Sequence, residues 1–220
     1  STPAAAGMDA RNGCENTWFL GGAGRWRDSG MAGAASQAHP RAFVNADPGE
    51  AVGALVEVIA EIRPQVVVTY DPQGGYGHPD HIQAHRITTA AVEAAAATGR
   101  WDVSKVYWTV LDRAAFARGL GELGPVPPGW SVQPEVSEWM TVEPERVTAE
   151  VDVAATLDAK RAALGAHATQ VAVAPDGRCY ALSNNVATPL LDREHYILVR
   201  GAPGSLGPDG REHDLFGGVA

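Results

Sequence analysis

The sequence has little cysteine, no long apolar run and no basic cluster, and each shortage argues against a class of protein. The two cysteines, Cys14 and Cys179, share no Cys-x-x-Cys spacing, which argues against a disulfide framework and a thiolate metal site. No apolar run approaches the roughly 18 residues that a membrane helix needs. No charged segment leads into an apolar one, as it would in a secretory signal, so the cytoplasm is the expected location.

Positive charge is also scarce. The formal net charge is −9, and the Lys and Arg residues are scattered along the sequence. Nucleic-acid binding requires a basic stripe, so neither nucleic acid nor a membrane is an expected partner. The remaining composition, 45% apolar and 20% charged, is that of an ordinary globular protein. A length of 220 residues allows one domain with a sizeable core, and a homo-oligomer is compatible with all of these features.

Hydrophobic periodicity predicts alternating helices and strands in the first half of the chain. The run Gln65-Val-Val-Val-Thr-Tyr70 is typical of a buried, interior parallel strand. The predicted elements are short strand 17–20, helix 48–62, strand 65–70, a helix from 79 to about 98, and strand 103–111. This alternation predicts an α/β fold with a doubly wound, Rossmann-like parallel sheet.

The pattern changes after Leu111, where glycine and proline become frequent. We expect a smaller mixed C-terminal lobe of the same domain over 113–200, beside an α/β core over 17–112. The lobe is predicted to contain strands 132–142 and 147–153, a helix that starts at Asp152 or Thr156 and runs to about His167, and strand 196–199. Residues 1–16 carry no period, and a loose tail is expected over 201–220.

The residues with the most chemistry lie between Tyr70 and His85, where the predicted strand leaves the sheet and a helix begins. In open α/β sheets this carboxyl edge is where ligands bind. Asp80 and His81 fall in the first helical turn after Pro79, a residue suited to that position.

These residues suggest a metal-dependent hydrolase. His81, held on a rigid helix, is a good zinc ligand, and Asp80 could orient an imidazole. His78, one turn away, could face substrate as a general acid or base, and Tyr76 could donate to a developing oxyanion. The same histidines could instead be surface imidazoles at a capped helix start, because a catalytic zinc usually has three protein ligands.

The string Gly-Gly-Tyr-Gly-His-Pro-Asp-His, ending at His81, resembles a motif of the LmbE-like (PIG-L-like) zinc de-N-acetylases. The segment Leu20-Gly-Gly-Ala-Gly-Arg-Trp-Arg-Asp-Ser-Gly-Met31 resembles the branch that removes acetate from N-acetylglucosaminyl-inositol in mycothiol biosynthesis. Further matching blocks are 66–71, 107–111, 166–170, 181–185 and 194–197. The resemblance covers about residues 17 to 200.

The resemblance implies a role for each matched residue. His81 would bind zinc, and His78 would protonate the leaving amine or steady the tetrahedral intermediate. Tyr76 would lie near the scissile carbonyl, and Asp80 would support His78 or the metal. The implied cofactor is one divalent zinc ion, which would polarise the amide and activate water. The implied ligand is a small amino-sugar conjugate.

The resemblance also implies that Asp28 binds sugar hydroxyls, with Met31 close by. From the residues alone, Asp28 could equally be a loop cap within Arg-Asp-Ser-Gly. A mycothiol-conjugate amidase would use the same metal machinery, but the loop around Asp28 favours the deacetylase. A nucleotide-binding fold is disfavoured because no Gly-x-Gly-x-x-Gly follows a strand.

One family motif does not occur in the sequence. Ala-x-His-Pro-Asp-Asp-Glu, which supplies the family's other zinc ligands and general base, has only the echo Ala38-His39-Pro40-Arg41. We therefore expect a shortened relative or a fragment that lacks the first βαβ unit and has an incomplete ligand set. A metal-free, non-catalytic sugar-binding relic is the alternative outside the enzyme class.

Overall fold

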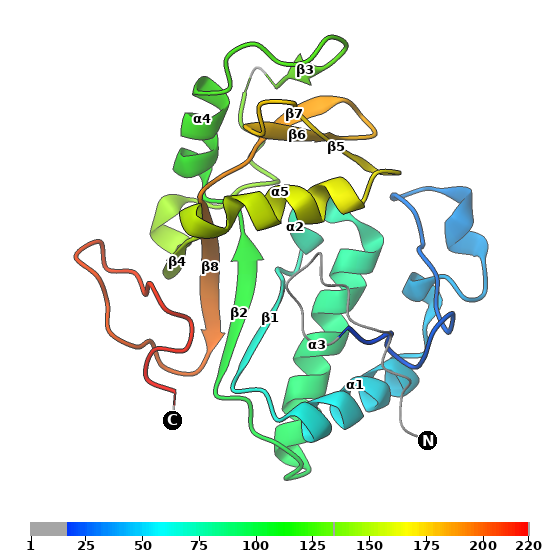
Figure 1. Ribbon diagram of the computed structural model, residues 1–220. Coiled ribbons are helices and arrows are strands. Elements are labelled where there is room, and N and C mark those ends of the chain that lie inside the picture. The colour runs from blue at the N-terminus through cyan, green and yellow to red at the C-terminus, as the bar shows by residue number, and fades with distance from the viewer. Residues whose placement is uncertain (1–16, 134, 220) are drawn as a thin grey trace.

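The computed structural model describes residues 17–133 and 135–219 and has a mixed α/β architecture with two four-stranded sheets (Figure 1). The expectation for residues 1–16 lies outside the described residues. The helices are α1 (Pro48–Ile62), α2 (Gly74–Gly77), α3 (Pro79–Ala97), α4 (Arg113–Gly121) and α5 (Leu157–Ala166). The strands are β1 (Val66–Tyr70), β2 (Lys105–Val110), β3 (Ser131–Val132), β4 (Ala149–Asp152), β5 (Val171–Val173), β6 (Cys179–Leu182), β7 (Val186–Pro189) and β8 (Arg193–Arg200).

The first sheet has the order β1-β2-β8-β4 and is mixed, which differs from the fully parallel sheet expected. Strands β1 and β2 are parallel and are connected through α3, whereas β8 runs antiparallel to β2, and β4 antiparallel to β8. Figure 1 shows the reason: β8 enters from the second sheet, beyond the carboxyl end of β2, and must run back. The parallel pair is therefore only the first half of the sheet.

Strand β1 was predicted to be interior, and this prediction is wrong for the described residues. β1 stands at the end of the strand order, and the side chain of Val68 is 46% exposed. A continuous apolar run indicates burial in general, but it does not distinguish an edge strand from a central one.

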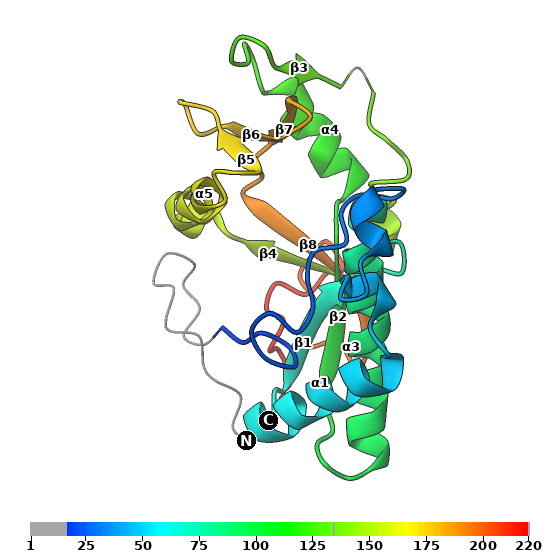
Figure 2. The same ribbon diagram turned by 90° about the vertical axis from the view of Figure 1, so that its right-hand side faces the viewer.

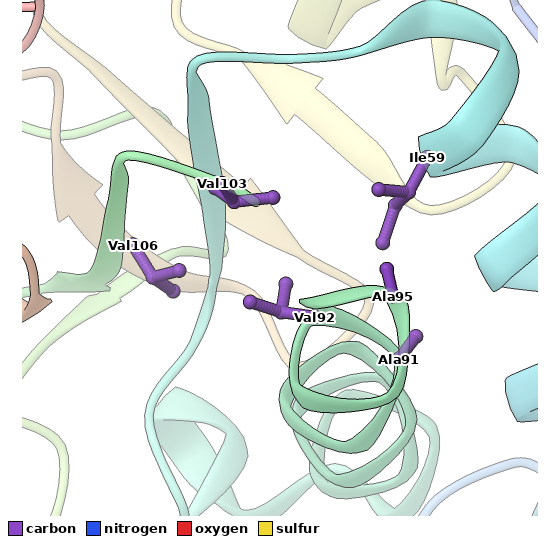
Figure 3. Packing of buried hydrophobic residues seen from close by; sticks show 6 residues of the cluster. All are labelled: Ile59, Ala91, Val92, Ala95, Val103 and Val106. Carbon is purple, nitrogen blue, oxygen red and sulfur yellow. The ribbon is translucent and has the colours of Figure 1, made fainter. Parts of the chain in front are cut away.

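Helices α1 and α3 cover one face of the β1–β2 pair and form the main core with it (Figure 3). Buried alanines on α3 allow the two helices to approach closely, and Ile59 of α1 packs against them. Asp47 caps α1 by accepting a 2.8 Å hydrogen bond from Glu50 N, as the Asp-Pro pair predicted. The core residues in Figure 3 are Ile59, Ala91, Val92, Ala95, Val103 and Val106.

The C-terminal segment covers part of the opposite face, which differs from the loose tail expected after residue 201. Leu215 packs against a cluster that contains Tyr107 and Ala149. Glu212 is only 1% exposed, accepts a 2.7 Å hydrogen bond from Tyr107 Oη, and pairs with Lys105 Nζ at 2.5 Å. A buried ion pair therefore holds the C-terminal segment against the first sheet, although its glycine content predicted a loose tail.

The second sheet, in the order β3-β7-β6-β5, stands with α5 beyond the carboxyl ends of β1 and β2 (Figures 1 and 2). Sequence periodicity missed α4 and β5 to β7, which are short. The strand predicted over 17–20 does not form, and among the described residues of the strand predicted over 132–142 only Val132, the last residue of β3, belongs to a sheet strand. Strands β4 and β8 join the first sheet, so the C-terminal part of the chain contributes to both sheets. Among the described residues, no helix is long and apolar enough to span a bilayer.

Candidate active site

A glycine-rich turn after β1 packs directly on the first turn of α3. Asp71 Oδ1 organises this turn by accepting hydrogen bonds from Gln73 N (3.0 Å) and Gly75 N (2.9 Å). Gly74 has a φ of +66°, and a Cβ there would lie 2.8 Å from Ile82 N and 2.9 Å from His81 Cβ. Only glycine combines this conformation with so close an approach.

His81 is held in the neutral form that suits a metal ligand. Its Nδ1 lies 3.1 Å from the Gly74 carbonyl oxygen, which assigns the proton to Nδ1 and leaves the Nε2 lone pair free. The ring stacks on Tyr70 with a 4.0 Å centroid distance and meets the edge of Tyr76 at 5.1 Å. Partial burial lowers the pKa of His81, which favours the uncharged imidazole.

His78 caps α3 and has the opposite tautomer. Asp80 N donates to His78 Nδ1 over 3.2 Å, so the proton of the neutral ring belongs on Nε2. The ring lies against His81 at 4.7 Å and in edge contact with Tyr76 at 6.0 Å. One imidazole therefore offers a lone pair, and its neighbour offers an N–H.

Tyr76 remains a phenol that can donate a hydrogen bond. Burial raises its pKa, and the neighbouring Tyr70 phenol and Asp28 carboxylate raise it further. Burial also raises the pKa of Tyr180 on β6, with a contribution from the neighbouring Tyr76. The sequence did not single out Tyr180, because the second sheet that brings it to the site was not predicted.

The loop carrying Asp28 reaches the same place from a distant part of the sequence. Asp28 Oδ1 accepts a 2.7 Å hydrogen bond from Gly30 N, so Asp28 caps its own loop as well. Its charge also acts on His81, where it opposes the lowering of the pKa by burial. Met31 is 53% exposed.

His85, one helical turn after His81 on α3, contacts strands β1 and β2. Its Nδ1 lies 2.9 Å from the Tyr70 carbonyl oxygen, and its ring meets the edge of Trp108 at 5.4 Å. Within residues 17–133 and 135–219, no group of three or more His, Cys, Asp or Glu side chains is placed to hold a metal ion. His81 alone fits a zinc site, and the described residues do not supply a complete ligand set.

A cavity of about 190 Å³ lies beside Tyr180, between the end of β2 and the second sheet. The ion pair of Lys160 and Glu194 lies on its wall. His195 also borders this cavity and is only 3% exposed. It belongs to β8, with its Nε2 3.3 Å from Glu150 Oε2, and this partner explains its burial.

Replacing Gly74 with alanine is expected to disturb His81 without unfolding the protein. The left-handed backbone would cost about 1–2 kcal/mol, and the new methyl group would push the turn away from α3. We expect a destabilisation of that order in urea unfolding, with a shifted His81 ring signal in NMR spectra. Gly99→Ala is the matched control, because Gly99 has the same φ of +66° but open space around its Cβ. An equal loss of stability in both variants with no shift at His81 would contradict the close-packing argument.

Comparison with known proteins shows the family of this chain. The family model described as "PIG-L: GlcNAc-PI de-N-acetylase" matches residues 4–92, beginning before residue 17, where we expected the resemblance to start. Relatives named 1D-myo-inositol 2-acetamido-2-deoxy-alpha-D-glucopyranoside deacetylase include those of Nocardia farcinica (62% identical) and Mycolicibacterium smegmatis (54% identical). Each match covers 91% of this chain, and 70% and 69% of the respective relatives. The chain belongs to the PIG-L (LmbE-like) family of de-N-acetylases.

Proposed function

We propose that this protein is a hydrolase of mycothiol biosynthesis that removes the N-acetyl group of N-acetylglucosaminyl-inositol. The observation that carries the proposal is the cluster of His78, His81 and Tyr76 at the carboxyl end of β1, with complementary imidazole tautomers. The names of relatives up to 62% identical support the same substrate. Amide hydrolysis requires donors for a developing oxyanion, and this cluster can supply them.

We assign the oxyanion-stabilising role to Tyr76 and His78. The phenol of Tyr76 is protonated, and the neutral ring of His78 carries its proton on Nε2. Protonating the leaving amine would require an imidazolium at His78, whose Nδ1 could then no longer accept from Asp80 N. Of the two roles implied by the family, the hydrogen bonds therefore favour steadying the tetrahedral intermediate.

We propose His81 as one zinc ligand, through its free Nε2. The described residues do not complete the ligand set. The reaction step that activates water is therefore not placed on these residues. Asp28 and Met31 are proposed to bind the sugar, and Asp28 has the stronger support because its charge acts on Tyr76 and His81.

We also propose three broader features of the protein. The unit formed by β1, α3 and β2 is proposed to be the Rossmann-like part of the fold, since a helix connects two parallel strands. The division into a core over 17–112 and a lobe over 113–200 is proposed for one domain. A cytoplasmic location is proposed as well, and cell fractionation would test it.

Asp28→Ala is expected to raise KM for N-acetylglucosaminyl-inositol about tenfold, because a hydrogen bond to a charged group would be lost. For N-acetylglucosamine, which lacks inositol, we expect a smaller rise. Initial rates of acetate release from both sugars test this. They are measured on a version of the protein extended at its N-terminus by a strand ending in His-Pro-Asp-Asp. Asp102→Ala is the control, since Asp102 pairs with Arg200 away from the site. Equal effects of Asp28→Ala on both sugars would show that the loop does not contact the inositol side.

A further inference from the structure

Ser29 anchors the loop that carries Asp28, which we call the sugar loop (residues 25–31). Its side chain is 0% exposed. Ser29 Oγ accepts from Val44 N (3.1 Å), and the Ser29 carbonyl accepts from Ser36 Oγ (2.7 Å). Its backbone N–H donates to Asp80 Oδ2 over 2.9 Å. A residue next to Asp28 is thus fixed to the helix turn that carries the histidines.

Asp80 is the only member of this network that belongs to α3. The family resemblance suggested that its carboxylate supports His78 or the metal, but the contact to His78 comes from the backbone N–H of Asp80. The carboxylate oxygen Oδ2 is bound to the sugar loop, and Oδ1 is buried without a hydrogen-bond partner among the described residues. The geometry thus separates two functions of one residue: its backbone orients His78, and its side chain holds Ser29.

We propose that Asp80 is a positioning residue that fixes the sugar loop relative to the imidazoles and thereby sets substrate affinity. This inference rests on the proposed function, because it takes Asp28 to be the sugar-binding carboxylate. The 2.9 Å bond to Ser29 N is charge-assisted. Without it, the first turn of α3 remains intact, but Asp28 is no longer held at a fixed distance from His81 and Tyr76.

The direct test is amide hydrogen exchange over residues 25–31 in the 220-residue chain, which requires neither metal nor turnover. Asp80→Ala should speed exchange of the Ser29 amide at least about tenfold, because its acceptor is removed. Asp80→Asn retains an uncharged oxygen acceptor and should restore much of the protection. Asp102→Ala should leave this loop unchanged. Should Asp80→Ala fail to fold, Ser36→Ala removes the bond to the Ser29 carbonyl, leaves Asp80 in place, and should also speed exchange in the loop.

A second measurement ties the loop to the sugar. Calorimetry with N-acetylglucosaminyl-inositol should show a Kd about tenfold weaker for Asp80→Ala than for the parent chain, with Asp80→Asn in between. In an active form, KM should rise while kcat changes less than about threefold, because the His78 ring keeps its bond to the residue-80 backbone N–H.

The outcomes separate this inference from the proposed function. Unchanged loop exchange in Asp80→Ala, or a fall in kcat at constant KM, would overturn the positioning role. If the parent chain binds none of the sugar while loop exchange still depends on residue 80, the proposed function fails and the mechanical link between Asp80 and Ser29 stands. Weaker sugar binding together with faster exchange supports both.

Discussion

The 220-residue chain is expected to bind zinc weakly, well below one equivalent, and to release little acetate. His81 offers a single imidazole nitrogen, whereas a catalytic zinc site usually has three protein ligands and an open position. His85 is set one helical turn further along α3, about 6 Å along the axis, and no group of three or more His, Cys, Asp or Glu side chains forms around either histidine in the described part of the chain. A version extended at its N-terminus by a strand ending in His-Pro-Asp-Asp should bind one equivalent and hydrolyse the amide. Metal analysis and an acetate-release assay on both forms measure the difference.

In the extended version, His81→Ala should remove the zinc and lower the rate of acetate release by several orders of magnitude. His213→Ala is the control, since this imidazole is half exposed and bonded to Asp209 in the C-terminal segment. Stoichiometric zinc in the 220-residue chain would mean that the side chain of Asp71, Asp80 or His85 moves and binds the ion. Zinc retained after His81→Ala would contradict the assignment of His81.

Glu212→Gln is expected to destabilise the protein by about 3–5 kcal/mol, because it leaves the Lys105 ammonium buried without its counter-ion. Both partners are nearly inaccessible, at 3% for Lys105 and 1% for Glu212. Urea unfolding at neutral pH measures the loss. Glu57→Gln, which breaks the exposed pair with Arg100, should leave stability almost unchanged, because solvent screens an ion pair at the surface. Similar small effects for both variants would show that the C-terminal segment is not fastened by this pair.

The same carboxylate should make stability depend on acid pH. Burial alone would raise the pKa of Glu212, but hydrogen bonds from Lys105, Gly204 and Tyr107 hold it below its usual value. A carboxylate whose pKa is depressed by folding stabilises the protein above its unfolded pKa, and this stabilisation is lost as pH falls through the folded value. Glu212→Gln should therefore flatten the acid limb of the stability curve.

The elements that the sequence predicted well are those with long local periods and clear starts. Helix α1 begins where Asp47-Pro48 placed it, and α3 begins after His78. The sequence also indicated which residues surround His81, because Gly74, His78 and Asp80 are close to it in the sequence as well as in space.

Features that depend on distant pairing could not be read from a local pattern. The hydrogen bond between Ser29 and Asp80 joins residues 51 positions apart, and the buried pair of Lys105 and Glu212 joins residues 107 apart. Each polar residue looks solvent-exposed in the sequence until its partner is known. The antiparallel direction of β8 likewise depends on where the second sheet ends, which short strands with frequent glycine and proline do not reveal.

The most direct measurement compares kcat/KM for N-acetylglucosaminyl-inositol with that for a mycothiol conjugate, using the zinc-loaded extended version. A site that binds the sugar through Asp28 and donates to the acetyl oxygen from Tyr76 and His78 should prefer the N-acetylated sugar by at least about tenfold. A preference for the conjugate would make the protein an amidase. Sugar binding with no acetate release from a fully zinc-loaded protein would contradict the assignment of a deacetylase site.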